Sequence, residues 1–248
     1  KAKYGQTIPE ILSYQKEQQE KLEKLQKFEE NFQFLKEKLV QTEKVLKEVS
    51  HELSEIRKEY SKQLDEKIID GLKELNFEDV DFSIRFDRRK NYTDNGYDTV
   101  EYEISTNPGE SRKPLGQIVS GGELSRIMLA IKAILADKDQ IDTLIFDEID
   151  TGISGRTAQK VSEKMAVIGR HHQVICITHL AQIAAMADTH FLIEKTVESG
   201  RTTSKIHRLP QEESVAELAR MLGGVSITET VLENAKEMKE LAAKTKKS

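Results

Sequence analysis

The sequence predicts an α/β fold in which a parallel sheet is flanked by helices, accompanied by a β-hairpin and preceded by a long coiled-coil helix. Three observations predict it. Apolar residues recur every seven positions through the first 60 residues, as in a coiled-coil seam. Two strictly alternating runs within residues 80–104 surround Asn95-Gly96, which predicts the hairpin. Residues 143–146 and 173–178 are short runs of branched apolar residues, typical of parallel strands buried on both faces.

The predicted coiled-coil seam combines two registers of apolar residues. One register runs from Tyr4 to Tyr60 and the other from Tyr14 to Ile56, each with polar interruptions. Beyond Tyr60 the apolar positions leave the seven-residue spacing, which indicates that the helix leaves a supercoil and docks on a globular part. A seam leaves an apolar stripe on the helix, so we expect this helix to need a partner.

The tip region of the predicted hairpin carries three consecutive basic residues, Arg88, Arg89 and Lys90. A solvated polar hairpin explains them without any function. The alternative is a contact with DNA phosphates, which would be independent of base sequence and weakened by salt. These three residues are therefore candidate DNA-binding residues.

A helix with an unusual start is predicted after residue 120. Ser120 and Glu123 form a capping box, and the apolar residues between Leu124 and Leu135 give the helix one apolar face. Gly121 and Gly122 are not explained by helix formation, because glycine costs about 1 kcal/mol relative to alanine in a helix interior. Without side chains they leave backbone N–H groups open at the positive end of the helix, where a phosphate can approach. An ordinary capped helix and a phosphate-binding helix both fit these residues.

Two carboxylates, Asp147 and Glu148, follow the predicted strand 143–146 directly. In open α/β sheets, ligands gather at the carboxyl ends of the strands. Adjacent acids repel each other unless they share a cation or a proton, so a metal ion explains the pair better than an acidic surface turn. One carboxylate could help hold Mg²⁺ while the other deprotonates a water molecule.

A histidine, His179, follows the second predicted strand. Residues 154–170 have the apolar spacing of a helix that connects the two strands. A right-handed crossover would place Asp147, Glu148 and His179 at the same edge of the sheet. On its own His179 would be a structural histidine, but beside two strand-end carboxylates it becomes a candidate site residue.

Length and composition set the class of protein. The chain has 248 residues, of which 33% are charged and 6% aromatic, enough for one domain core and a long polar extension. Its net charge of −5 argues against a globally basic nucleic-acid binder but allows a local basic patch. The single cysteine, Cys176, lies in an apolar run and favours a reduced, cytoplasmic protein without disulfides. No apolar stretch of ~20 residues predicts a membrane span.

The C-terminal part predicts further helices and strands. These are a strand pair, 191–193 and 206–209, around Ser199-Gly200, a helix over 214–222 stopped by Gly223-Gly224, and a final helix opened by a capping box of Ser226 and Glu229.

Taken together, the motifs resemble those of ABC-type ATPases. Ser120 to Glu123 resembles their signature motif, Leu144 to Glu148 their Walker B strand, Thr151 to Gly155 their D-loop, and His179 their switch histidine. Their order and spacing are similar to the SMC-like branch of that family. The longer strings resemble a bacterial member that acts in recombination and DNA repair; they are Thr106–Glu110, Ser120–Met128, Phe146–Gly155 and Thr178–Ala184.

For the fold, this resemblance implies the C-terminal lobe of an ABC/SMC-type ATPase head. Residues 1–75 would form the arm helix that enters the head. Residues 76–224 would form the lobe with the signature motif, Walker B, D-loop and switch histidine, and residues 225–248 a C-terminal helix packed on the head.

The resemblance also implies roles for the candidate residues. Asp147 would coordinate Mg²⁺, Glu148 would be the general base for the attacking water, and His179 would sense the γ-phosphate of ATP. The signature motif of one head would bind the ATP held by another. The ATP-binding residues would then be Ser120, Gly121, Gly122 and Glu123, and the D-loop residues Thr151, Gly152, Ile153 and Ser154.

Two departures from the family pattern matter. The D-loop usually ends in aspartate, where this sequence has Ser154, so a D-loop carboxylate role is in question. No G-x-x-x-x-G-K-[ST] string occurs in the sequence. In the family this Walker A loop lies in the N-terminal half, ahead of the coiled coil. The resemblance therefore implies a C-terminal fragment that neither binds ATP tightly nor hydrolyses it alone.

The resemblance implies an ATPase for double-strand-break repair by homologous recombination, in which ATP closes two heads and hydrolysis releases them. Its implied partners are double-stranded DNA or DNA ends, the N-terminal half of the same protein, and a second copy through heads or arms, at the nucleoid and without a membrane. Two alternatives stay open: a chromosome-organising, cohesin-like SMC protein, and a scaffold with a degenerate head. Self-pairing of the arm helix also stays open.

Overall fold

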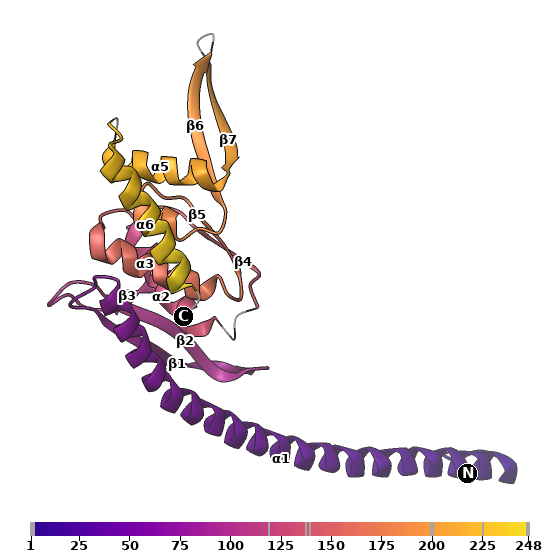
Figure 1. The fold of residues 1–248 in the computed structure, drawn as a ribbon. Helices are drawn as coiled ribbons and strands as arrows, with labels where there is room; N and C mark the ends of the chain where they lie inside the picture. The colour runs from indigo at the N-terminus through magenta and orange to yellow at the C-terminus, as the bar shows by residue number, and fades with distance from the viewer. Residues whose placement is uncertain are drawn as a thin grey trace. The chain divides into compact units, whose positions relative to one another are not determined.

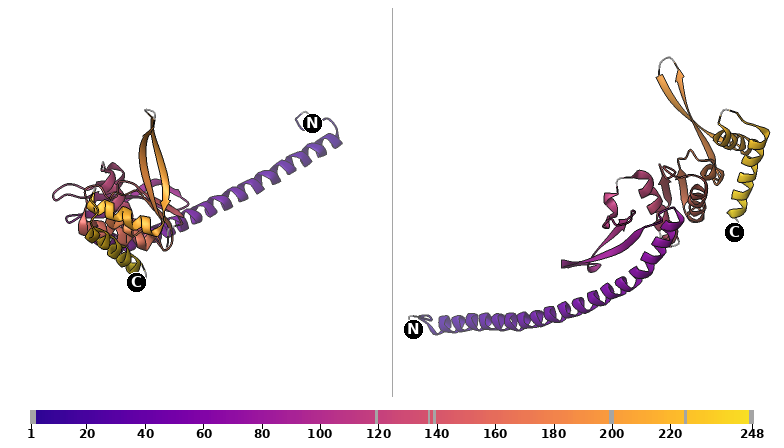
Figure 2. Two further views of the ribbon diagram at one scale, coloured as in Figure 1. Left: turned by 45° about the horizontal axis from the view of Figure 1, so that its top comes forward. Right: turned by 90° about the vertical axis from the view of Figure 1, so that its left-hand side faces the viewer.

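The chain folds as two compact units in this computed structural model. The structure describes residues 3–118, 120–136, 138, 140–198, 201–224 and 226–246. The first unit comprises Lys1–Glu59 and Asp87–Thr99, and the second comprises Tyr60–Phe86 and Val100–Ser248. Figures 1 and 2 show the elements of both units, which are described separately below.

The predicted arm is one continuous helix, α1 (Ile8–Glu74). Its start is capped by Glu10, whose carboxylate accepts hydrogen bonds from the backbone N–H of Gln6 (2.7 Å) and Thr7 (3.3 Å). In the first unit the apolar seam is exposed, with Leu25 and Phe28 each 66% accessible to solvent. The heptad stripe is therefore left uncovered along this part of the helix.

The predicted hairpin is confirmed, and its strands are longer than expected. β1 (Asp81–Thr93) neighbours β2 (Gly96–Ser105), and β2 pairs antiparallel with the short β3 (Lys113–Pro114), which precedes a 3₁₀ turn at Leu115–Gln117. Gly96 has a φ of 85°, a left-handed conformation that favours glycine. The Thr93 hydroxyl donates to the Gly96 carbonyl (2.9 Å), which helps fix the turn.

The core of the second unit joins the end of α1 to the parallel strands. Ile68 and Leu72 of α1 and Leu75 just after it are fully buried, so the last turns of α1 are part of this core, as the departure from the heptad predicts. Around them pack α2 (Gly121–Leu135) and α3 (Gly155–Ile168), with Phe82 from β1. The expected arm, residues 1–75, therefore contributes residues 60–75 to the second unit.

The two predicted parallel strands and their crossover helix are confirmed. β4 (Thr143–Phe146) pairs in parallel with β5 (Gln173–Cys176), in a register from Thr143 with Gln173 to Phe146 with Cys176. α3 connects them and packs against α2.

Burial of this strand pair on both faces was expected, and the structure has it on one face only. Leu144, Phe146 and Val174 face the core. On the other face, Ile145 is 68% exposed, and Ile175 and Ile177 are 44% and 50% exposed. The described helices pack on one side of the pair, so the opposite apolar face remains open.

The C-terminal elements form a second apolar cluster in the same unit. α4 (Ala181–Ala185), α5 (Gln211–Gly223) and α6 (Glu229–Thr245) pack together around Leu218, Ala219 and Ala235. β6 (His190–Glu198) and β7 (Arg201–Leu209) form an antiparallel ribbon that projects from these helices (Figures 1 and 2). The predicted turn at Ser199-Gly200 lies outside the described residues.

The start of the last helix differs from the expectation. Thr228, rather than Ser226, is the N-cap of α6, and its side chain accepts from the Val231 N–H (3.4 Å). Serine and threonine are both favoured as capping residues, and Thr228 stands three residues before that N–H group, at the position a capping side chain needs. In the described parts of the chain, no helix is both long and apolar enough to cross a membrane.

Candidate functional site

The start of α2 has the predicted capping serine. The Ser120 hydroxyl oxygen accepts from the Glu123 N–H (3.4 Å), and the Ser120 carbonyl accepts from the Leu124 N–H (3.0 Å). Ser120 and Gly121 are exposed, whereas Gly122 is buried. The positive end of this helix therefore reaches solvent at its N-cap residue and its first residue.

The two glycines lie against the turn that follows β4. A Cβ atom on Gly121 would be 2.5 Å from a carboxylate oxygen of Glu148. A Cβ atom on Gly122 would be 3.0 Å from the Glu148 carbonyl oxygen and 3.0 Å from the Thr151 Cβ. Close packing within this chain is thus already a reason for glycine at both positions, independent of any phosphate.

The two predicted carboxylates, Asp147 and Glu148, are both exposed at the end of β4. An Asp147 carboxylate oxygen accepts from the Glu148 N–H (2.9 Å), and the Ser125 hydroxyl donates to the Asp147 carbonyl (3.0 Å). Glu148 has a φ of 56°, in the left-handed region. That conformation costs a non-glycine residue about 1–3 kcal/mol and is concentrated at functional sites.

Arg126 holds the same turn against α2, a role that sequence reasoning missed. It is 8% exposed, and its guanidinium donates to the Thr151 carbonyl (2.9 Å) and the Ile149 carbonyl (3.4 Å). Burial lowers its pKa, and the nearby Glu123 partly opposes this shift. Arg126 lies within the string Ser120–Met128 that resembles the family, which was its only signal in the sequence.

Asp150 connects this turn to the end of β5, and sequence reasoning gave it no role. The residue is 3% exposed. One of its carboxylate oxygens accepts from the Thr178 hydroxyl (2.6 Å) and the His179 backbone N–H (2.8 Å), and the His179 Nδ1 lies 3.0 Å from the same oxygen. The His179 side chain remains 72% exposed. Because β4 and β5 are parallel neighbours, Asp147 and His179 follow strands that end at the same edge of the sheet.

The predicted D-loop residues form the connection into α3. The Thr151 N–H donates to the Glu148 carbonyl (3.0 Å), and Gly152 has a φ of 74°. Ile153 packs against the core, and Ser154 is the exposed N-cap residue of α3. The neighbouring Cys176 is not a reactive thiol, because burial, with added repulsion from Asp150 and Asp147, raises its pKa to about 12.

The carboxylates fit a magnesium ion only together with other ligands. Among the residues that the structure describes, no group of three or more His, Cys, Asp or Glu side chains could hold a metal ion. Mg²⁺ is commonly bound by one or two carboxylates, with water and phosphate oxygens completing its shell. The exposed Asp147 carboxylate fits that kind of site and does not fit a cage made entirely of protein ligands.

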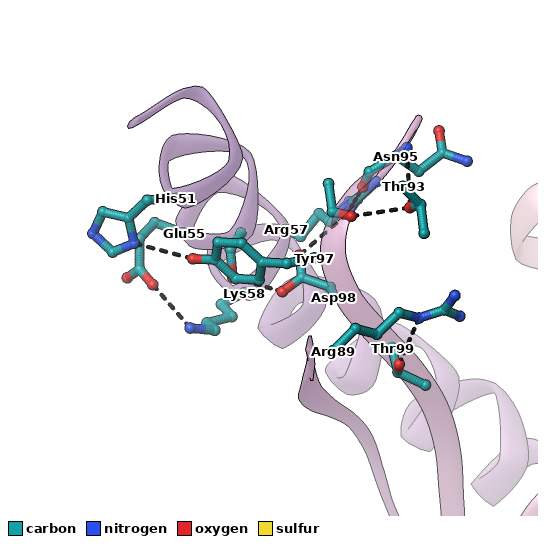
Figure 3. A network of polar contacts seen from close by, with 12 residues as sticks. His51, Glu55, Arg57, Lys58, Arg89, Thr93, Asn95, Tyr97, Asp98 and Thr99 are labelled. Atoms are coloured by element: carbon teal, nitrogen blue, oxygen red, sulfur yellow. Dashed lines mark hydrogen bonds and ion pairs between the residues drawn. The ribbon is translucent and has the colours of Figure 1, made fainter. Parts of the chain in front are cut away.

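The predicted basic residues of the hairpin lie in the first unit, and Figure 3 shows one of them, Arg89, near the polar contacts between the hairpin and α1. The Arg88 guanidinium stacks over the Tyr97 ring at 4.4 Å, and the Arg89 Nε donates to the Thr99 hydroxyl (2.8 Å). Both arginines and Lys90 are exposed. Two of the three cations are thus oriented by the hairpin itself while remaining accessible.

A buried aspartate joins this hairpin to the helix. The Asp98 carboxylate accepts from the Ser54 hydroxyl (2.9 Å) and from the Arg57 guanidinium (3.1 Å). The Asp98 side chain is 4% exposed, and Arg57 also donates to the Asn95 carbonyl (2.8 Å). Figure 3 shows this pair beside the contact between His51 and the Tyr97 hydroxyl.

Comparison with known proteins gives the family. No family model matches the chain. The DNA repair protein RecN of Halalkalibacterium halodurans is 42% identical over 99% of this chain and 44% of its own length. RecN of Bacillus subtilis is 40% identical, over 99% of this chain and 45% of its own length. RecN of Treponema pallidum is 35% identical, over 98% and 44%.

A solved structure has the same fold. The crystal structure of an Smc head domain with a coiled coil and joint, from Pyrococcus yayanosii, has a TM-score of 0.51 at 23% identity. The match covers 86% of this chain and 38% of that chain. The fold is therefore the predicted one, a lobe of an SMC-type head with a long N-terminal helix. The chain spans less than half the length of the relatives named above, and it belongs to the RecN family of DNA repair proteins, of which it matches the C-terminal part.

Proposed function

We propose that this chain is the signature-motif half of an ATP-hydrolysing head that acts in double-strand-break repair and homologous recombination. One observation carries the proposal. Arg126 links α2 to the turn after β4, and Asp150 links that turn to His179 after β5. The exposed start of α2, the two carboxylates and the histidine are therefore connected to one another. A helix start that can bind phosphate, beside strand-end acids, is suited to phosphoryl transfer to water.

Each candidate residue has a distinct task in this proposal. The N–H groups at Gly121 and Gly122, with Ser120 and Glu123, bind the terminal phosphates of ATP held by another head. Glu148 accepts the proton of the attacking water, and His179 contacts the γ-phosphate. A bound Mg²⁺, held in part by Asp147, would neutralise charge on the phosphates. The D-loop, residues 151–154, lies next to this helix start through the contact between Gly122 and Thr151.

The rest of the head is proposed to come from the N-terminal half of the same protein. Parallel sheets are almost always covered on both faces, and here Ile145, Ile175 and Ile177 form an open apolar face. The relatives are more than twice as long as the match, and the printed sequence has no phosphate-loop string. We therefore expect this chain alone neither to bind ATP tightly nor to hydrolyse it.

The arm and the hairpin are proposed to link ATP to DNA. The exposed seam of α1 would pair with a helix from the N-terminal half, since an apolar stripe of this length needs a partner. Closing two heads on ATP would then move the arms of a homodimer, which hold double-stranded DNA or its ends at the bacterial nucleoid. Arg88, Arg89 and Lys90 would contribute contacts to the phosphate backbone.

The test is ATP hydrolysis by this chain, alone and mixed with the separately expressed N-terminal half, with and without linear double-stranded DNA. Activity that appears only on mixing supports a head shared by two halves. If the two halves are folded and bound to each other but do not hydrolyse ATP, the proposal is contradicted and the scaffold with a degenerate head is favoured.

The base is tested in the complete protein. Glu148→Gln should lower kcat by about 10²–10⁴-fold, because general-base catalysis contributes that much, while ATP binding and head pairing persist. Glu233→Gln, on the exposed face of α6, is the matched control and should turn over normally. Undiminished turnover in Glu148→Gln would remove Glu148 from its assigned role.

A further inference from the structure

We infer that Asp150 is a positioning residue for His179: it fixes the imidazole with its proton on Nδ1 and ties it to the turn after β4. The kinetic consequence of this inference depends on the proposed function. The pairing of the Asp150 and His179 side chains does not depend on the proposed function, because it concerns the chain without ATP.

The geometry is specific to the histidine. The Asp150 carboxylate oxygen accepts two hydrogen bonds, from the Thr178 hydroxyl and the His179 backbone N–H, and the His179 Nδ1 lies 3.0 Å from the same oxygen. The Thr178 hydroxyl also accepts from the Leu180 N–H (3.0 Å), which directs its own proton toward Asp150. The Thr178 hydroxyl and the His179 N–H therefore hold the carboxylate in place, with one of its oxygens close to the imidazole ring of His179.

The chemistry of the carboxylate sets the tautomer. An ionised carboxylate can only accept hydrogen bonds, so the imidazole nitrogen facing it must carry the proton. With Nδ1 protonated, a neutral His179 presents the lone pair of Nε2 on a side chain that is 72% exposed. Carboxylate partners orient metal-bound and catalytic histidines in the same way.

A merely structural aspartate would not need this arrangement. Burying a carboxylate is costly unless donors compensate it, and here the compensating donors are the Thr178 hydroxyl and the His179 N–H, both in the segment after β5. Asp150 itself lies three residues after Asp147 and its backbone is in the turn that contacts the start of α2. A shift of that turn would therefore carry His179 with it.

Nuclear magnetic resonance of the ¹⁵N-labelled chain tests the pairing directly. The His179 ring signals are assigned by their loss in His179→Gln, and their two-bond couplings report which nitrogen carries the proton. We expect the proton on Nδ1 in the unmodified chain above neutral pH. Asp150→Ala should shift it toward Nε2, the form that free histidine side chains prefer. Thr178→Val, which removes a donor to the same oxygen but leaves the ring contact, should keep Nδ1 protonated.

A proton found on Nε2 in the unmodified chain overturns the inference, even if Asp150→Ala fails to fold. So does a tautomer that is the same in a folded Asp150→Ala variant.

A double-mutant cycle in the complete protein tests the consequence. Asp150→Ala should lower kcat by about 10- to 100-fold, the usual effect of losing a residue that orients a site histidine, with KM changed less than about twofold. In a His179→Ala background it should add less than about twofold, because Asp150 acts through His179. If the fold-losses in kcat from Asp150→Ala and His179→Ala multiply in the double variant, Asp150 does not act through His179 and the positioning role is overturned. Normal turnover in His179→Ala overturns the task proposed for His179, whereas the tautomer measurement stands or falls separately.

Discussion

Two aspartate side chains among the described residues, Asp98 in the first unit and Asp150 in the second, are buried and are compensated differently. Asp98 in the first unit faces the permanent cation of Arg57 together with the Ser54 hydroxyl. Asp150 in the second unit faces a hydroxyl, a backbone N–H and an imidazole. Both side chains are 4% exposed.

This difference separates a contact that serves only folding from one that can take part in the chemistry of the site. The charge of Asp98 is matched by a guanidinium that stays protonated at all physiological pH values, so the contact is fixed. The partner of Asp150 is a histidine, whose proton can move and whose outer nitrogen is open to solvent. We expect changes at Asp98 to act on folding and changes at Asp150 to act on chemistry.

The largest expected effect on stability is at Asp98. Asp98→Ala leaves Ser54 without its acceptor and Arg57 with only the Asn95 carbonyl, and it should destabilise the hairpin on α1 by about 2–3 kcal/mol. Hydrogen exchange of the amides in residues 87–99 measures this locally. Removing both charges, with Asp98→Asn and Arg57→Met, should recover at least part of the stability. If Asp98→Ala left exchange unchanged, the aspartate would not be a structural contact.

The two glycines at the start of α2, Gly121 and Gly122, sharpen the comparison within the second unit. Gly122→Ala should cost about 1–3 kcal/mol, because its new Cβ meets a backbone oxygen and the Thr151 Cβ, neither of which can move freely. Gly121→Ala should cost less than about 1 kcal/mol, because the Glu148 carboxylate can rotate away and alanine favours a helix. Urea unfolding of the two variants measures the difference. Equal destabilisation would mean that the turn after β4 does not pack on α2.

The sequence predicted what local patterns determine. The seven-residue spacing predicted α1, Asn95-Gly96 predicted the turn of the hairpin, and the strand, helix, strand pattern predicted the parallel pair with its crossover. Each depends on neighbours in sequence, where side-chain periodicity and turn conformation act directly.

Contacts between distant residues were not predictable in the same way. Arg126 binds carbonyls more than twenty positions away, and Asp150 binds residues 178 and 179. Nothing in the spacing of an arginine or an aspartate says which distant groups it will meet. The open face at Ile145 was missed for a related reason, since an apolar strand is equally apolar whether or not this chain covers it.

The basic hairpin should have a measurable but smaller effect, on DNA rather than on stability. Replacing Arg88, Arg89 and Lys90 by alanine in the complete protein should weaken DNA binding and reduce the salt slope by about 0.9 for each DNA phosphate that is no longer neutralised. Arg88→Lys with Arg89→Lys keeps the charges but alters the contacts with Tyr97 and Thr99, so its salt slope should stay near that of the unmodified protein. If the salt slope of the alanine variant were unchanged, the DNA contact would be rejected and the three residues would be part of a solvated polar hairpin.

The smallest expected effect is a pH dependence at His190, which contrasts with the exposed His179. The pKa of His190 is lowered by burial and then by Lys239, while Glu217 partly opposes this. Because the unfolded chain binds a proton at about pH 6.5 and the folded chain only at lower pH, the unfolded state takes up more protons in between. The stability that depends on neutral His190 is therefore complete above about pH 6.5 and declines as the pH falls below that value.

Thermal unfolding between pH 7.5 and 5.5 measures this decline. His190→Gln, which can still bond to the Ser214 hydroxyl that His190 contacts at 2.9 Å, should flatten the pH dependence. His207→Gln, at an exposed histidine on β7 that pairs with Glu194, is the matched control and should leave the part due to His190 in place. An identical slope in His190→Gln and the unmodified chain would assign the acid sensitivity to other groups. Acid would then act through the paired carboxylates, and the contrast between the half-buried His190 and the exposed His179 would have no consequence for stability.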